Sequence, residues 1–261
     1  VNSDMAALDA LPFGMGVGLA ALAGLLLGSF LATLVLRWPQ GRSVLRGRSQ
    51  CDACGAALTA RDLVPLLSAF AARGRCRHCG APIEAFHWRV ELLSAAFGAT
   101  ALALMPGTTG WLWALFGWLL LPLALLDARH MWLPDPLNAV LALAGLLLAG
   151  PLLDVSLLDR WIGAVAGGLV LAAIAAAYRR VRGGEGMGGG DPKLVAAIGC
   201  WIGWQALPLL LLLASLGGLV WALAFQRKGD EPLSTRAVPF GVFACAAAWA
   251  TVPLWPWISG R

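Results

Sequence analysis

Long apolar segments constrain the fold of this 261-residue chain more than any other feature. Hydrophobic residues make up 59% of the sequence and charged residues only 13%, whereas about a quarter of a soluble domain is charged. About 20 consecutive apolar residues suffice for a helix to cross a bilayer. Apolar segments near that length occupy residues 11–36, 90–105, 110–126, 137–153, 161–178, 194–225 and 238–257. Because the segment 194–225 is too long for one span, we expect a break near residues 203–208. The pattern therefore predicts an all-α, polytopic membrane protein with about eight transmembrane helices.

The basic residues predict the orientation of these helices. With the N-terminus outside, eight alternating spans place every Lys and Arg except Arg160 and Arg261 on one face. The positive-inside rule assigns that face to the cytoplasm. The net charge of +5 is then a signal of orientation and not of nucleic-acid binding, because the basic residues follow the loops. We also expect residues 1–4 to be a tag remnant that precedes a native start at Met5.

One long polar loop, residues 37–89, contains two Cys-x-x-Cys pairs, each followed by a glycine. The pairs, 21 residues apart, are Cys51/Cys54 and Cys76/Cys79. Four thiolates with this spacing are typical of a structural, tetrahedral zinc site. Disulfides and redox-active or metal-free thiols are the alternatives, and a cytoplasmic location disfavours disulfides. We expect Cys200 and Cys245 to be small core residues, and His78 to be a surface residue.

Two aspartates at the ends of apolar segments are the candidate catalytic residues. Asp127 follows the segment 110–126, and Asp191 follows three glycines, residues 188–190. Ionisable groups kept near a bilayer are functional candidates because their burial is costly. Two carboxylates that share a proton can act as general base and general acid. The glycines permit positive φ angles and close approach of another backbone, but their order does not match a phosphate-binding loop.

Neighbouring charged residues have both structural and functional interpretations. Asp135 is expected to be the N-cap of a helix with Pro136 at its first position. Lys193 either tunes the field near Asp191 or simply marks the membrane interface. Glu91 and Glu185 lie in apolar or glycine-rich surroundings and also remain candidates.

At these residues the chain strongly resembles the bacterial prepilin peptidases, the leader peptidases of type IV pili and type II secretion. The resemblance covers nearly the whole chain and is carried by seven motifs in combination. They are Gly28-Ser-Phe-Leu, Arg37-Trp-Pro39, the double Cys-x-x-Cys loop with Arg73 through Gly80, Val90-Glu-Leu-Leu93, Asp127 through Pro134-Asp135, Glu185 through Leu194, and Pro239-Phe-Gly241. Two positions depart from many relatives: Arg129 replaces a second aspartate, and Ala32-Thr33 replaces Asn-Val.

The resemblance implies a Gly-x-Gly-Asp aspartyl protease in a bacterial inner membrane. Asp127 and Asp191 would be its catalytic pair, in a protease domain at residues 90–261, with Gly188, Gly190 and Lys193 in the supporting loop. Residues 1–36 would form the first transmembrane segment. The substrates would be prepilins or pseudopilins, cleaved after a glycine at the cytoplasmic face. Many members also methylate the new N-terminus with S-adenosylmethionine. The sequence contains no Rossmann-type glycine pattern that would locate a site for this methyl donor.

Two other classes of function remain open from the residues alone. A membrane transporter or metal-handling protein could use the aspartates as ion ligands and the cysteines as a metal sensor. A structural assembly factor of the secretion apparatus would tolerate replacement of both aspartates. The mapping of both aspartates to one cytoplasmic edge favours the protease.

Overall fold

The protein is described by a computed structural model at residues 8–44, 50–51, 53–59, 64–66, 68, 72–183, 187–226 and 238–260. Within these ranges the regular elements are helices, and the only strand-like pairing is two isolated β-bridges, Gln50–Ala57 and Arg75–Pro82. The expected all-α fold is therefore confirmed. The chain divides into two compact units, Val1–Trp118 and Leu119–Arg261. The expected tag remnant at residues 1–4 lies outside the described residues.

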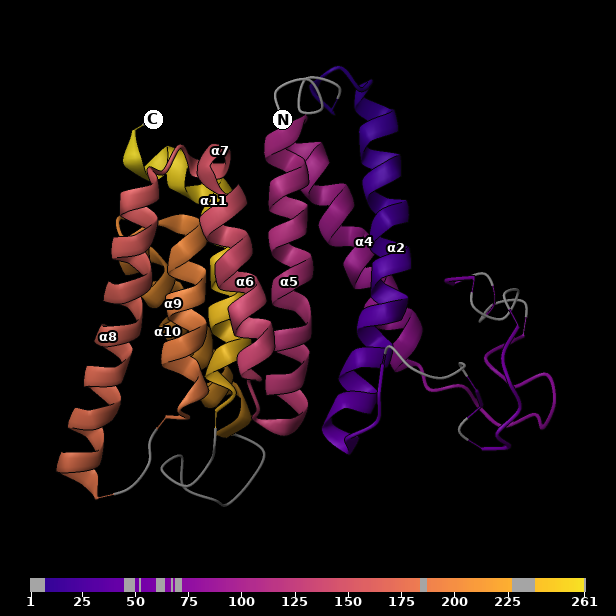
Figure 1. Cartoon of the computed structure of the whole chain (residues 1–261). Coiled ribbons are helices and arrows are strands. Elements are labelled where there is room, and N and C mark those ends of the chain that lie inside the picture. The colour runs from indigo at the N-terminus through magenta and orange to yellow at the C-terminus, as the bar shows by residue number, and fades with distance from the viewer. Residues whose placement is uncertain are drawn as a thin grey trace. The chain divides into compact units, whose positions relative to one another are not determined.

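The first unit contains helix α2 (Phe13–Arg37), the short 3-10 helix η1 (Trp38–Gln40), helix α4 (Phe86–Leu104) and the start of helix α5 (Thr108–His130). Helices α2 and α4 lie side by side (Figure 1). A buried row of small residues recurs at every fourth position of α2: Gly16, Ala20, Gly24, Gly28 and Ala32. A Cβ atom on Gly28 would lie 2.6 Å from the Cα of Glu91 in α4. Small residues at this spacing let two membrane helices approach closely.

In the second unit, other helices pack around helix α9 (Gly190–Ile202), which is buried along most of its length. Helix α6 (Asp135–Leu148), helix α8 (Leu157–Arg182) and helix α11 (Phe240–Ser259) contact α9, and helix α10 (Leu207–Gln226) packs against α11. The short helix α7 (Gly150–Leu153) follows α6. At the contact of α8 with α9, Gly163 and Gly199 face each other backbone to backbone. The predicted break in the segment 194–225 is confirmed, because α9 ends at Ile202 and α10 begins at Leu207.

Five helices of the described part are long and apolar enough to cross a membrane: 13–40, 108–130, 157–181, 207–224 and 240–259. Helix α6 is a shorter apolar helix. The chain is therefore a multi-pass membrane protein. The total of eight spans stays a prediction. Most of the apolar surface of α8 is exposed, including Leu158, Val165 and Leu169, as expected for a helix that faces lipid.

The structure corrects the expected role of Asp135 as a helix cap. Helix α6 begins at Asp135 itself, and Pro134 occupies the cap position. Both oxygens of the Asp135 carboxylate accept hydrogen bonds of 2.8 Å from Lys193 Nζ. A cation from the neighbouring helix therefore takes the place of the backbone N–H groups that a capping side chain would bind.

Candidate active site and metal centre

Asp127 lies in the last turn of helix α5 and is only 4% exposed. The Val242 N–H, in the first turn of α11, donates a hydrogen bond of 3.1 Å to Asp127 Oδ2. N–H groups in the first turn of a helix lack intrahelical partners, and the helix dipole favours an anion there. The N-terminus of α11 therefore stabilises the ionised carboxylate of Asp127. This burial excludes a solvated helix end, the structural interpretation open from sequence.

Gly241 explains how α11 comes this close to Asp127. A Cβ atom at Gly241 would lie 2.8 Å from Asp127 Oδ2 and 2.9 Å from its Cγ. Real Cβ atoms do not approach a carboxylate so closely, so only glycine leaves room for this contact. The motif Pro239-Phe-Gly241 thus has a structural role, because its glycine leaves space for the Asp127 carboxylate beside the first turn of α11.

Asp191 lies in the first turn of α9 and is 7% exposed. Its backbone N–H bonds to the carbonyl oxygen of Gly188 at 3.3 Å. Gly189 does not use the positive φ that a glycine permits, since its φ is −66°. Gly190 instead serves close packing, because a Cβ atom there would lie 2.8 Å from the Cβ of Leu133. The first two residues of this motif, Glu185 and Gly186, lie outside the described residues.

Leu133 links the surroundings of the two aspartates. Its side chain is 8% exposed and lies against Gly190 on one side. On the other side its Cδ1 atom would lie 3.2 Å from a Cβ atom at Gly241. Burial and, after it, the negative charge of Asp127 raise the pKa of Asp191 to about 6. The structure therefore brings the two sequence-predicted aspartates into one buried, acidic site.

Lys193 pairs with Asp135 and not with Asp127 or Asp191. Its ammonium binds Asp135, and the two side chains are 56% and 67% exposed. This exposed ion pair joins the first turn of α9 to the first turn of α6. Exposed pairs contribute only about 0.2–1 kcal/mol to stability. We therefore place Lys193 in the support of the loop and not among the reacting groups.

The four cysteines of the polar loop form a compact cluster. The sulfur atoms of Cys51, Cys54, Cys76 and Cys79 all lie within 4.8 Å of one another. The sulfurs of Cys51 and Cys79 are 3.9 Å apart. A tetrahedral zinc ion with Zn–S bonds of about 2.3 Å has S–S separations of roughly 3.8 Å. The geometry of the thiols therefore fits a metal ion bound by four sulfur ligands.

The two cysteine pairs fold in the same way. The N–H of Gly55 bonds to the oxygen of Cys51 at 2.8 Å, and the N–H of Gly80 bonds to the oxygen of Cys76 at 2.9 Å. Both glycines have a positive φ, 70° and 71°, which side chains rarely adopt. Each pair is thus a tight turn that directs two sulfurs to one point.

Local hydrogen bonds prepare the sulfurs for a cation. Backbone N–H groups of Cys79 and His78 lower the pKa of Cys76 to about 6, which favours its thiolate. For Cys79 the N–H of Ala81 acts to lower the pKa, but the Cys54 thiol and desolvation outweigh it, and the pKa rises to about 11. Crowded thiols in one cluster disfavour the ionisation of all four at once. A divalent cation would neutralise their charge and let all four ionise.

Sequence reasoning missed the support that surrounds the aspartates. Neither Leu133 nor Val242 carried a signal of its own, because one is an ordinary apolar residue and the other acts through its backbone. Pro239 was the available signal, since a proline just before an apolar segment is typical of a helix start. A helix start of this kind attracts anions.

The fold and site define a class: helical, multi-pass membrane proteins with a buried pair of aspartates in one unit and a four-cysteine cluster in the other. Comparison with known proteins gives the family. The model of the Bacterial Peptidase A24 N-terminal domain matches residues 22–105, and that of the Type IV leader peptidase family matches residues 114–223. The chain belongs to the type IV leader peptidase family.

Similar proteins from several bacteria carry the name prepilin leader peptidase/N-methyltransferase. The protein of Burkholderia pseudomallei (strain 1026b) is 39% identical over 95% of this chain and 88% of its own length. The protein of Aeromonas hydrophila is 44% identical over 80% of this chain and 71% of its own. The protein of Stutzerimonas stutzeri is 34% identical over 90% of this chain and 89% of its own length. No solved structure matches.

Proposed function

We propose that this protein is a membrane aspartyl endopeptidase that removes the basic leader from type IV prepilins or type II secretion pseudopilins after a glycine. It then methylates the mature N-terminus. The observation that carries the peptidase is the buried pair Asp127 and Asp191, whose carboxylates interact electrostatically. The names of the relatives supply the substrate class and the second activity.

The surroundings of the aspartates support distinct roles for them in cleavage. Asp127, which accepts the Val242 N–H at the start of α11, is the ionised general base. Asp191 is held close to that negative charge and carries the shared proton, since like charges disfavour a second ionisation. Asp127 removes a proton from water, whose oxygen bonds to the scissile carbonyl carbon. Asp191 donates its proton to the departing amine as the C–N bond breaks.

The four-cysteine cluster would hold a structural zinc ion. Four thiolates complete a tetrahedral shell and leave no position for a reactive water. The polar loop is too short to bury a large core, and zinc ligation contributes roughly 10–16 kcal/mol to the folding of small zinc-finger peptides. The proposal also divides the chain into residues 1–36, a transmembrane segment, residues 37–89, a zinc-binding loop domain, and residues 90–261, a protease domain.

Methylation would use S-adenosylmethionine as a cosubstrate. When bound, this cosubstrate supplies a methyl group whose bond to sulfur breaks as a bond to the N-terminal nitrogen forms, which leaves S-adenosylhomocysteine and one released proton. The role of this chain is to bind the donor and to present the mature N-terminus as a neutral amine.

The charge distribution supports a location in the bacterial inner membrane with the acidic site at the cytoplasmic face. Asp127 lies at the end of α5 beside Arg129 and His130, and positive residues mark cytoplasmic helix ends. A prepilin would place its apolar segment among the membrane helices and its basic leader in the cytoplasm. A transporter with carboxylate ion ligands is the alternative, but membership of the leader peptidase family disfavours it.

Replacement of each aspartate tests the peptidase. Purified Asp127→Asn and Asp191→Asn variants should each lose leader removal from a prepilin in detergent or liposomes, while membrane insertion and bound metal persist. The amide keeps the shape of the side chain but can neither bind nor release the required proton. Cleavage at the wild-type rate by either variant would refute the assignment.

A further inference from the structure

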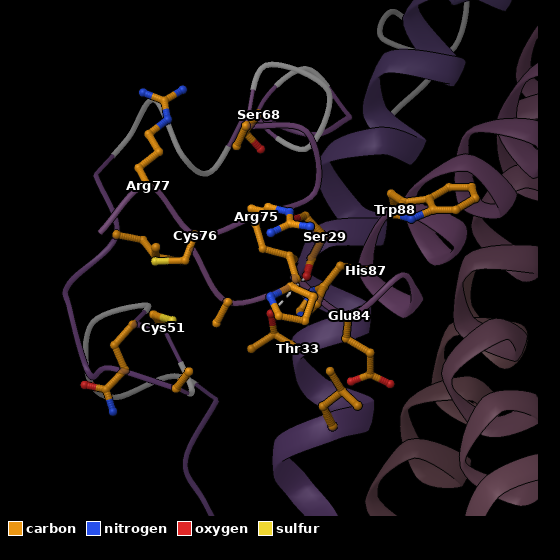
Figure 2. Close-up of a pocket in the computed structure, with 18 of the residues that line it drawn as sticks. Ser29, Thr33, Cys51, Ser68, Arg75, Cys76, Arg77, Glu84, His87 and Trp88 are labelled. Atoms are coloured by element: carbon orange, nitrogen blue, oxygen red, sulfur yellow. Dashed lines mark hydrogen bonds between the residues drawn. The ribbon is translucent and has the colours of Figure 1, made fainter. Parts of the chain in front are cut away.

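A cavity of about 370 Å³ lies in the first unit, whereas the two aspartates belong to the second unit. Its walls come from the second half of α2, the cysteine loop and the first turns of α4. Figure 2 shows Arg75 of the loop and His87 of α4 together over the face of α2 that carries Ser29 and Thr33. Cavities of about 300–1,000 Å³ are typical of small-molecule sites.

Glu91 contributes a buried carboxylate to the lining of this cavity. The residue lines the cavity but is only 6% exposed. One carboxylate oxygen, Oε2, accepts a hydrogen bond of 2.8 Å from the Leu66 N–H of the loop. Close contact of Gly28 with the Glu91 backbone fixes the position of the residue. A carboxylate this buried is costly without cationic or hydrogen-bonding partners.

The lining carries charges of both signs. Arg37, Arg42, Arg75 and Arg77 line the cavity together with Glu84 and Glu91. Arginine binds a carboxylate through two parallel N–H groups, whereas a buried glutamate attracts a cation or hydroxyl groups. The basic leader of a prepilin does not suit this lining, because four arginines would repel it. A polyphosphate does not suit it either, since Glu91 would repel the phosphate groups.

We propose that this cavity binds S-adenosylmethionine, so that it is the methyl-donor site of the methyltransferase; the inference rests on that proposed activity. The donor has an α-carboxylate, a sulfonium cation, ribose hydroxyls and an aromatic base. Arg75 binds the carboxylate. Glu91 attracts the sulfonium or accepts from the ribose, and the imidazole of His87 offers an aromatic face to the base. The same set of groups binds S-adenosylhomocysteine, except for the attraction to the sulfonium.

The cysteine cluster contributes to the same cavity. Cys51 and Cys76 belong to its lining, and Arg75 precedes Cys76 directly. The metal would therefore order the wall that carries Arg75. This arrangement gives the four-cysteine loop a function beyond its own folding: it holds one side of the donor site.

Direct binding tests the proposal without reference to turnover. The affinity of purified full-length protein for S-adenosylmethionine and S-adenosylhomocysteine is measured by isothermal titration calorimetry, with metal content recorded for each variant. Glu91→Gln and Arg75→Gln should each weaken S-adenosylmethionine binding at least tenfold. Both should cleave the leader within twofold of wild type, because Asp127 and Asp191 lie in the other unit. Arg73→Gln is the matched control, since Arg73 lies in the same loop but does not line the cavity.

The outcomes separate this inference from the proposed function. If wild-type protein neither binds the donor nor methylates the mature N-terminus, the methyltransferase itself is refuted. If wild type binds and methylates, but Glu91→Gln and Arg75→Gln bind as tightly as wild type, only the location is refuted. Asp127→Asn should lose cleavage and keep donor binding. Arg75 is exposed, so Arg75→Gln should fold. If Glu91→Gln does not fold, the donor affinity of Arg75→Gln alone tests the location of the site.

Discussion

The Val242 N–H donates to Asp127 Oδ2 at 3.1 Å, although the two residues are 115 positions apart. This bond joins the end of α5 to the start of α11 and places a helix N-terminus against a buried carboxylate. Aspartates in a low-dielectric site need such donors to remain ionised. This donor supports the proposal that Asp127 is the general base of the peptidase and that its partner Asp191 is the acid.

Gly241→Ala should reduce leader cleavage by roughly 10–100-fold, because a misplacement of about 1 Å at a reacting group has effects of this size. The new Cβ atom would meet Asp127 Oδ2 at 2.8 Å and displace the carboxylate or α11. The measurement is kcat on a purified prepilin. Gly18→Ala is the control, since a Cβ atom there meets no atom within 4 Å. Equal rates for both variants would remove Gly241 from the proposed mechanism.

Gly190→Ala and Gly189→Ala form a matched pair within one motif. At Gly190 the added Cβ atom would lie 2.8 Å from the Leu133 Cβ, whereas at Gly189 it would meet no atom within 4 Å. We expect about a tenfold or greater loss of cleavage for Gly190→Ala, because Asp191 is the next residue and moves with it. Gly189→Ala should remain within about twofold. If the two variants lose equal activity, the glycines act through loop flexibility and not through packing.

The sequence predicts the arrangement of the cysteines more completely than that of the aspartates. The four cysteines were placed correctly because their spacing is local and a tight turn brings each pair together. The sequence also singles out the two aspartates, which the structure buries, but it does not predict the residues that support them. Leu133, Gly190 and Gly241 meet only after α9 and α11 have packed, and an apolar periodicity does not specify which helices pack together. Asp135 was assigned wrongly for the same reason, since its partner Lys193 is 58 positions away.

Gly28→Val should loosen the contact of α2 with α4. A Cβ atom at Gly28 would lie 2.6 Å from the Glu91 Cα, and overpacking of this kind costs about 1–3 kcal/mol. The measurements are thermal unfolding in detergent and affinity for S-adenosylhomocysteine, and both should decrease. Gly18→Val, on the same helix in open space, should change neither. Unchanged unfolding and affinity in Gly28→Val would show that α2 and α4 do not require this close approach.

Lys193→Met should affect cleavage far less than Asp191→Asn. The Lys193–Asp135 pair is exposed on both sides, so its loss should cost about 0.2–1 kcal/mol of stability. We expect kcat within about threefold of wild type, and the same for Asp135→Asn. The double variant should lose no more than either single variant, since the two side chains act as one pair. A loss of 100-fold in Lys193→Met would instead place its ammonium among the reacting groups.

Cys76→Ser should remove the metal and weaken donor binding while cleavage persists. Serine cannot supply a thiolate, so three sulfurs remain of the four that lie within 4.8 Å, and zinc affinity depends on a complete set of ligands. Atomic absorption should fall from about one zinc ion per chain to near zero. His78→Ala should keep the metal, because the substitution retains the backbone N–H that contacts Cys76 and the ligand cluster consists of the four cysteines. Because Cys76 also lines the cavity, S-adenosylhomocysteine should bind Cys76→Ser at least tenfold more weakly. A metal-free variant with wild-type donor affinity would separate the cluster from the donor site.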